Sequence, residues 1–132
     1  MSAYDLASRP IHLGLGASAE VEPEFKGDMQ WYVDYENRHV ADGAEGRLVG
    51  IHTFTESWGM WECHPAGCEV VLCTAGKMTL LPELPDGQVQ KTVLGPGQYA
   101  INAPGVWHTA DIEGEATAVF ITAGMGTEHR PR

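Results

Sequence analysis

Two glutamates and a histidine, Glu62, His64 and Glu69, lie within eight residues of one another in the stretch WECHPAGCE, together with Cys63 and Cys68. Imidazole and carboxylate groups in this number can hold a divalent metal ion. Cysteines at this spacing can instead bind zinc or take part in redox chemistry. A third interpretation is a polar hairpin with no special chemistry. The geometry of a β-strand separates the three.

Successive side chains on a strand point to opposite faces. Glu62 and His64 therefore share one face, and Cys63 lies on the other. The Pro-Ala-Gly sequence that follows turns the chain, so Glu69 returns on a second strand with its carboxylate toward the same space, while Cys68 faces away. This pattern predicts three metal ligands close together and argues against a zinc site built from cysteines.

A fourth ligand has to come from a distant segment. The stretch GPGQYAINAPGVWHTADI offers His108, which follows a Pro-Gly turn that fixes its direction of approach. The three cysteines all lie within eleven residues, an odd count that fits neither a disulfide framework nor a paired zinc motif and favours free thiols. Cys73 shares the parity of Glu69, and we expect it to be a small buried apolar group.

The elements that must position these residues read as short β-strands. From residue 47 onward, segments rich in β-branched and aromatic residues alternate with turn sequences. The segments are RLVGIHTFTES, WGMWECH, EVVLCTAGKMTLL, QVQKTVL, QYAINA, VWHTADI and EATAVFITA, with breaks at PAG, PELPDG, GPG, APG and EGE. This spacing predicts an all-β sandwich or barrel.

The ends of the chain are harder to interpret. Residues 30–35 suit a strand or a short helix, and we favour the strand because tryptophan, tyrosine and valine dominate them. We expect one domain, with residues 1–46 capping the barrel or contacting a partner subunit and residues 47–126 forming the barrel. Residues 127–132 are expected to be a frayed tail, although Arg130 is able to close over a pocket carboxylate.

The charge balance excludes some functions. Eighteen acidic residues against eight basic ones give a net charge of -10, and no lysine or arginine cluster is present to neutralise a row of phosphates. We therefore expect no nucleic-acid partner. No stretch approaches the roughly 18 consecutive apolar residues of a membrane span, so we expect no membrane association and a soluble cytoplasmic protein.

Two segments within residues 55–122 resemble the sequence motifs of the cupin family. In the first cupin motif, His-x-His is followed by three or four residues and a glutamate, and then by six residues and a glycine. Here Glu62-x-His64 is followed by Glu69 and Gly76 at those spacings. The family's first histidine is therefore replaced by Glu62.

The second cupin motif is a glycine, five residues, a proline, any residue, a glycine, two residues and a histidine. Here Gly97 is followed at those spacings by Ala103, Gly105 and His108. The motif's proline is replaced by Ala103, but Pro104 follows directly and keeps a Pro-Gly turn.

The resemblance implies a fold and a cofactor. It implies a cupin-type, jelly-roll-like β-barrel of two packed antiparallel sheets, often a homodimer, with one divalent metal ion held by Glu62, His64, Glu69 and His108. Two imidazoles and two carboxylates would leave such a site electrically neutral and a weaker Lewis acid. They favour Mn²⁺ or Fe²⁺ and still permit Ni²⁺ or Zn²⁺. The alternative is a metal-free pocket in which these groups bind one another or a ligand.

Several residues near the motifs can form a pocket. Trp58 and Met60 share the parity of Glu62 and can line a pocket, although core packing explains them equally well. Trp61 and Trp107 should point out of the barrel, where we expect at least one to lie in a homodimer interface or under the N-terminal segment. His52 has apolar neighbours and is expected to be a core histidine, with a role in the pocket as the alternative.

The function that the resemblance implies is a metal-dependent enzyme acting on a small polar metabolite, of dioxygenase, isomerase or lyase type. The fold does not choose among these reactions. The alternative is a non-catalytic cupin that binds or senses a ligand, with or without a metal. Either way, we expect a small molecule as the partner of the pocket.

Overall fold

The computed structural model describes residues 1–132 and consists mainly of antiparallel strands. Its strands are β1 (Ile11–Leu13), β2 (Ala19–Val21), β3 (Arg47–Phe54), β4 (Met60–Cys63), β5 (Glu69–Pro82), β6 (Thr92–Leu94), β7 (Tyr99–Asn102), β8 (His108–Thr122) and β9 (Glu128–Pro131). Its helices are α1 (Met29–Arg38) and two short 3-10 segments (Leu15–Ala17 and Val40–Glu45). No helix has both the length and the apolar composition needed to cross a membrane.

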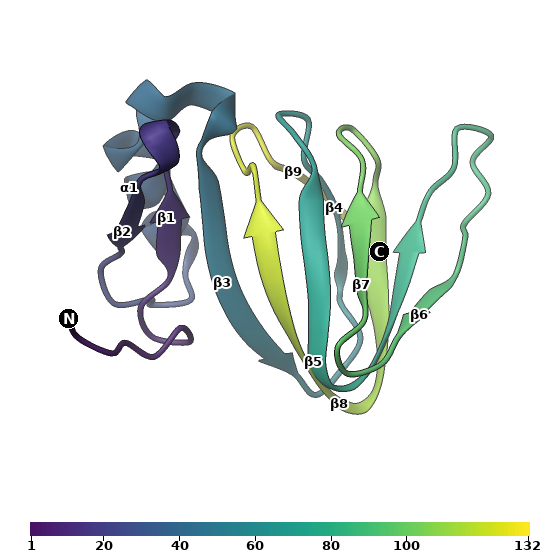
Figure 1. Cartoon of the computed structure of the whole chain (residues 1–132). Helices are drawn as coiled ribbons and strands as arrows, with labels where there is room; N and C mark the ends of the chain where they lie inside the picture. Colours follow the sequence, from purple (N-terminus) through teal and green to yellow (C-terminus); the bar gives the residue numbers. More distant parts are fainter.

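The strands form two layers because β5 and β8 pair with each other along their length and fold over near the middle (Figure 1). The first layer has the order β2-β1-β3-β8-β5-β7. The second layer has the order β9-β4-β8-β5-β6 and uses the other halves of β8 and β5. This arrangement confirms the expected all-β fold of two packed antiparallel sheets.

The fold-over of β5 and β8 differs from the sequence-based expectation. The sequence EGE at residues 113–115 predicts a break, whereas β8 continues through it. The strand bends without ending because Gly114 adopts a φ of +73° and because β5 shifts its register against β8 twice between residues 73 and 78. Gly76 is required here, since a Cβ atom would lie 2.0 Å from the carbonyl oxygen of Glu115.

The hydrophobic core lies between the two layers. Its buried members are Val71, Cys73, Met78, Leu80, Leu94, Ala110, Ile112, Ala116, Ala118 and Phe120. Cys73 is fully buried among them, as expected of a small apolar group. All three cysteines are free.

The strand favoured for residues 30–35 is wrong, because these residues belong to α1. Asp28 caps the helix, with its carboxylate accepting a hydrogen bond of 2.9 Å from the backbone N–H of Trp31. Trp31 and Tyr35 are four residues apart, so they share one helix face, and both are buried. The cap and this spacing outweigh the strand preference of the aromatic residues.

A hydrogen-bonded cluster holds α1 against β1. The buried His12 ring contacts the Tyr35 hydroxyl through Nδ1 and the Asp42 carboxylate through Nε2, each at 2.6 Å. It also stacks on His39, whose ring centroid lies 3.6 Å away. His12, His39 and Asp42 are close enough to bind a metal ion, but both nitrogens of His12 already have protein partners. We interpret this cluster as structural.

The expected frayed C-terminus instead forms β9, which pairs with β4 and places His129 opposite Glu62. Arg130 does not reach the pocket. It forms an ion pair with Glu83, and its guanidinium lies 5.1 Å from the Trp61 ring centroid and 4.6 Å from that of Trp107. The C-terminal strand, rather than the N-terminal segment, therefore covers the two outward-facing tryptophans.

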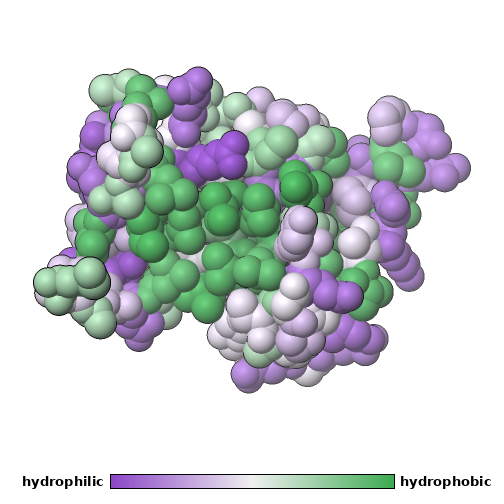
Figure 2. Space-filling model, viewed as in Figure 1, coloured by the Kyte–Doolittle hydropathy of each residue, from purple (hydrophilic) through white to green (hydrophobic).

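The outer face of the first layer is apolar over several strands. Register places Val49, Ile121, Val70 and Ile101 in one row across β3, β8, β5 and β7. Figure 2 shows a continuous hydrophobic area on this side of the molecule. Ile101 keeps 59% of its surface exposed.

Candidate functional site

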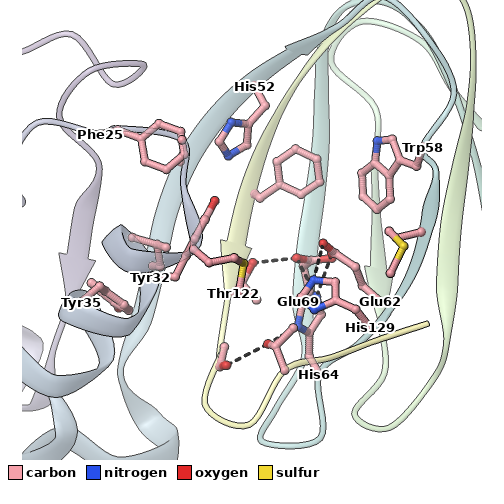
Figure 3. A pocket seen from close by; sticks show the side chains of 18 of the residues that line it. Phe25, Tyr32, Tyr35, His52, Trp58, Glu62, His64, Glu69, Thr122 and His129 are labelled. Carbon is pink, nitrogen blue, oxygen red and sulfur yellow. Dashed lines mark hydrogen bonds and ion pairs between the residues drawn. The ribbon is translucent and has the colours of Figure 1, made fainter. Parts of the chain in front are cut away.

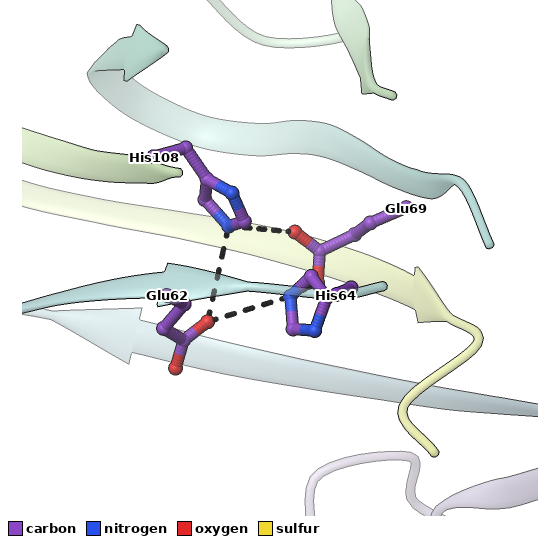
Figure 4. Close-up of side chains that lie close together, drawn as sticks. All are labelled: Glu62, His64, Glu69 and His108. Carbon is purple, nitrogen blue, oxygen red and sulfur yellow. Dashed lines mark ion pairs between the residues drawn. The ribbon is translucent and has the colours of Figure 1, made fainter. Parts of the chain in front are cut away.

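The four residues expected to bind a metal come together between the layers (Figure 4). Glu62 lies on β4, His64 follows that strand, and Glu69 and His108 begin β5 and β8. Glu69 lies centrally, with one oxygen 3.2 Å from Nε2 of His64 and the other 3.2 Å from Nε2 of His108. Glu62 is more distant, with Oε2 at 3.6 Å from Nε2 of His64 and 3.9 Å from that of His108.

Burial distinguishes Glu62 from the other three. The side chains of His64, Glu69 and His108 are almost completely buried, whereas that of Glu62 is 30% exposed. Glu62 therefore lies where the cluster meets the pocket. Its second oxygen lies 3.3 Å from Nε2 of His129, which brings a residue of the C-terminal strand to the edge of the site.

The outer nitrogens of the two histidines are held by hydrogen bonds. Nδ1 of His108 donates to the carbonyl oxygen of Val106 at 3.2 Å, since a carbonyl can only accept. Nδ1 of His64 lies 2.8 Å from the hydroxyl of Thr127, and that hydroxyl donates its proton to the carbonyl of Gly124. Thr127 therefore accepts from His64. In a neutral ring, both bonds leave Nε2 without a proton and facing the cluster.

These two Nε2 atoms are buried and have no hydrogen-bond partner. Each lies 3.2 Å from a Glu69 oxygen, but neither contact has the direction of a hydrogen bond. Buried polar atoms are rarely left unpaired. Two nitrogen lone pairs and two carboxylates within 4.8 Å of one another are a donor set that fits a divalent metal ion.

Glu69 is held by further contacts that the sequence analysis missed. Asn102 donates to one of its oxygens at 3.1 Å, and Thr122 donates to the other at 2.7 Å. Burial by itself raises the pKa of Glu69, but the His108 and His64 rings outweigh burial and hold that pKa well below its usual range. Glu69 is therefore a carboxylate at neutral pH.

The charge of Glu69 also acts on His108. Burial lowers the pKa of His108, but the negative charge of Glu69, 3.2 Å from Nε2, outweighs burial and raises the pKa above its ordinary value of 6.5. Without a metal ion, a proton on His108 would neutralise part of the negative charge. A metal ion would take the place of that proton.

A cavity of about 770 Å³ extends from the cluster toward α1 (Figure 3). Its walls come from α1 and the segment before it, from β3, and from the loop leading into β4. Trp58 and Met60 line it, and so does His52, which is half-buried and receives no hydrogen bond from the protein. His52 is thus a pocket residue rather than a satisfied core histidine.

The cysteines lie apart from the candidate site, since no group of potential ligands includes one. Cys63 is buried beside the C-terminal strand. Burial and the nearby Glu128 raise the pKa of its thiol, although Arg130 lowers it. A raised pKa disfavours the reactive thiolate, so the redox interpretation of this stretch receives no support.

No protein-family model matches the sequence, and a comparison with curated proteins finds no match. Solved structures do share its fold. An oxalate oxidase has a TM-score of 0.54 at 17% sequence identity, and the match covers 61% of this chain and 44% of that one. A Neisseria meningitidis protein has a TM-score of 0.50 at 20% identity, with 59% of this chain and 74% of that chain covered.

A third structure is the hydroquinone 1,2-dioxygenase of Sphingomonas sp. TTNP3 with 4-hydroxybenzoate bound. Its TM-score is 0.50 at 17% identity, and the match covers 58% of each chain. The match thus spans less than two thirds of the oxidase and the dioxygenase. At these identities the similarity concerns the fold, and the chain has the cupin fold that its motifs imply.

Proposed function

We propose that the protein is a metal-dependent cupin enzyme that binds one divalent metal ion through Glu62, His64, Glu69 and His108 and acts on a small molecule in the adjacent cavity. The observation that carries this proposal is the state of the two histidines. Their outer nitrogens donate to Val106 and Thr127, so the buried Nε2 atoms face two carboxylates with free lone pairs.

The residues of the chain have distinct roles in this proposal. The bound metal, Mn²⁺ or Fe²⁺ in preference to Ni²⁺ or Zn²⁺, supplies Lewis-acid chemistry toward substrate oxygens. Glu69, His64 and His108 form the buried part of the site. Glu62 faces the cavity, where its carboxylate can accept a proton from a bound molecule, and His129 holds its second oxygen at 3.3 Å.

Metal analysis of protein purified without an affinity tag tests the proposal. We expect close to one equivalent of a transition metal, lost on chelation and regained on adding Mn²⁺ or Fe²⁺, with a rise in melting temperature. Glu69→Gln should abolish the rise. Less than about 0.1 equivalent of every transition metal, with no thermal shift for any of the four ions, would contradict the metalloenzyme.

The alternative is a metal-free pocket that binds or senses a ligand. Two observations favour it: Glu69 already accepts hydrogen bonds from Asn102 and Thr122, and the pKa of His108 is raised. A protonated His108 would then balance the carboxylate without a metal ion. Ligand binding that is unchanged by chelation, together with the absence of metal, would support this alternative.

The N-terminal segment supplies a cap in our proposal. Phe25, Met29, Tyr32 and Val33 line the cavity from α1 and the residues before it. Burial and the Glu62 carboxylate raise the pKa of Tyr32 to about 12, so its hydroxyl keeps its proton at neutral pH. Residues 1–46 would then complete the pocket within one chain rather than serve a partner subunit.

We also propose a homodimer, formed through the apolar outer face of the first layer. A row of aliphatic side chains across four strands can pack against its copy in a second chain, and an exposed apolar patch of this kind is typical of an interface. Ile101→Lys should give a monomer in size-exclusion chromatography with light scattering. Val93→Lys is the matched control, because Val93 is 56% exposed on β6 of the other layer. A wild-type monomer at micromolar concentration would refute the dimer.

A further inference from the structure

Aromatic rings form a continuous wall along the cavity. Five of them, with centroids 5.4 to 6.0 Å apart in succession, are Tyr32, Phe25, His52, Phe120 and Trp58. The last ring, Trp58, lies 6.2 Å from that of His108. The wall thus runs from α1 to the four-residue cluster. Successive rings are tilted 37° to 77° against one another, so they offer both faces and edges to a bound molecule, and such contacts favour an aromatic ligand over a sugar-like one.

The charges around the cavity have one sign. Its lining includes the carboxylates of Glu36, Glu56, Glu62 and Glu69 but no lysine or arginine. A bound divalent metal ion would offset Glu62 and Glu69 and leave the carboxylates of Glu36 and Glu56, two solvent-exposed residues of the lining, without a cationic partner there. A ligand that carries its own carboxylate would therefore meet repulsion without a cationic partner.

His52 adds a polar contact to the aromatic wall. Its ring is half-buried, lines the cavity and has no hydrogen bond to the protein. Figure 3 shows it beside Phe25, on the part of the wall away from Glu69 and His64. Burial lowers its pKa, although Glu69 raises it, and the net shift is downward. At neutral pH the ring is thus uncharged, with one N–H donor and one acceptor free for a ligand.

We propose that the pocket selects uncharged aromatic compounds that carry a hydroxyl group at each end, one near Glu62 and His129 and the other hydrogen-bonded to His52. This inference rests on the proposed pocket and narrows its substrate class. The proposed ligand is polar only at its two ends, and the body between them is apolar and planar.

Three compounds of nearly equal size test the proposal by calorimetry. They are 4-hydroxybenzyl alcohol, its carboxylate counterpart 4-hydroxybenzoate, and the non-aromatic 4-(hydroxymethyl)cyclohexanol. In chelator-treated protein we expect the alcohol to bind at least tenfold more tightly than the carboxylate and at least fivefold more tightly than the cyclohexane compound. Equal or tighter binding of either competitor would overturn the proposal.

Binding is measured again after metal titration, which keeps two failures apart. If the protein binds no metal, the proposed metalloenzyme is refuted, but the preference of the metal-free protein for 4-hydroxybenzyl alcohol can still be measured and judged by itself. Absence of the preference refutes the substrate class, whatever the metal result.

Two sets of variants assign the preference to residues. His52→Phe keeps the ring and should weaken binding of 4-hydroxybenzyl alcohol about fivefold, and His52→Gln, which keeps a donor and an acceptor, should restore most of it. The double variant with Glu36→Gln and Glu56→Gln should reduce the ratio of the affinity for 4-hydroxybenzyl alcohol to the affinity for 4-hydroxybenzoate. Glu113→Gln is the control, since Glu113 is 83% exposed and pairs with Lys77 outside the cavity. If the control reduces this affinity ratio as much as the double variant does, the proposed role of the pocket carboxylates is wrong.

Discussion

Thr127 offers a sharp test of the metal site, because it touches no proposed ligand atom and acts only through His64. Its hydroxyl accepts from Nδ1 of His64 at 2.8 Å and donates to the carbonyl of Gly124 at 2.8 Å. Thr127→Val keeps the shape of the side chain and removes both bonds. The His64 ring is then free to rotate, or to carry its proton on Nε2, which faces the site.

The expected cost follows from the loss of this single support. Removing the hydrogen-bond partner of a metal-binding histidine typically lowers metal affinity 10- to 100-fold, which corresponds to about 1.4 to 2.7 kcal/mol. Thr127→Ser keeps the hydroxyl and should bind metal as the wild type does. The assay is competition for Mn²⁺ or Zn²⁺ with a chromophoric chelator at constant pH.

A control separates this effect from general destabilisation. Thr53→Val removes a similar bond, the 2.8 Å contact between the hydroxyls of Thr53 and Thr117, far from the cluster. Metal affinity should not change in this variant. If Thr127→Val binds metal within twofold of the wild type while remaining folded, the assignment of the His64 proton is wrong.

Three further predictions concern the site and the fold. Glu62→His should shift metal preference about tenfold toward Ni²⁺ and Zn²⁺ over Mn²⁺ in competition assays, and an unchanged preference would mean that Glu62 is no ligand. Gly76→Ala should lower the free energy of unfolding in urea by about 3 kcal/mol, because its Cβ meets a backbone oxygen at 2.0 Å and its φ is +73°. Gly87→Ala has a φ of +84° without a clash and should cost about 1 kcal/mol; equal losses would exclude the clash as the cause. In chelator, the stability difference between wild type and Glu69→Gln should be largest between pH 4.5 and 6.5. The Glu69 contribution is lost as the pH falls through its lowered pKa, and the His108 contribution is lost as the pH rises through its raised pKa. If the difference in melting temperature between the two proteins keeps growing above pH 8, these contributions of Glu69 and His108 are wrongly assigned.

The gathering of three of the four candidate ligands was predictable because its causes are local, whereas His108 joins them through the pairing of β8 with β4. Strand alternation places Glu62 and His64 on one face, and a turn returns Glu69 to the same space. The turn before His108 sets that residue at the start of β8. That these residues bind a metal ion stays a prediction.

The supports of the site could not be predicted, since they depend on distant pairing. Thr127 and His129 reach the cluster only because the C-terminal residues pair with β4, and isolated tail sequences give no sign of such pairing. Asn102 and Thr122 contact Glu69 because β7 and β8 flank β5. The sequence-based expectation missed α1 because it relied on the aromatic composition of the segment, whereas in the structure the cap residue Asp28 outweighs that composition.

The fold-over of β5 and β8 also links the site to the kinetic stability of the whole domain. Glu69 pairs with Thr122 and Pro82 with His108, so Glu69 and His108 lie at opposite ends of one two-stranded ribbon. In a straight ribbon of this length those ends would be about 40 Å apart. Folded over, they lie in contact at 3.2 Å. A metal ion bound to both residues would cross-link the two ends of the ribbon. Its removal should then speed unfolding as well as empty the site.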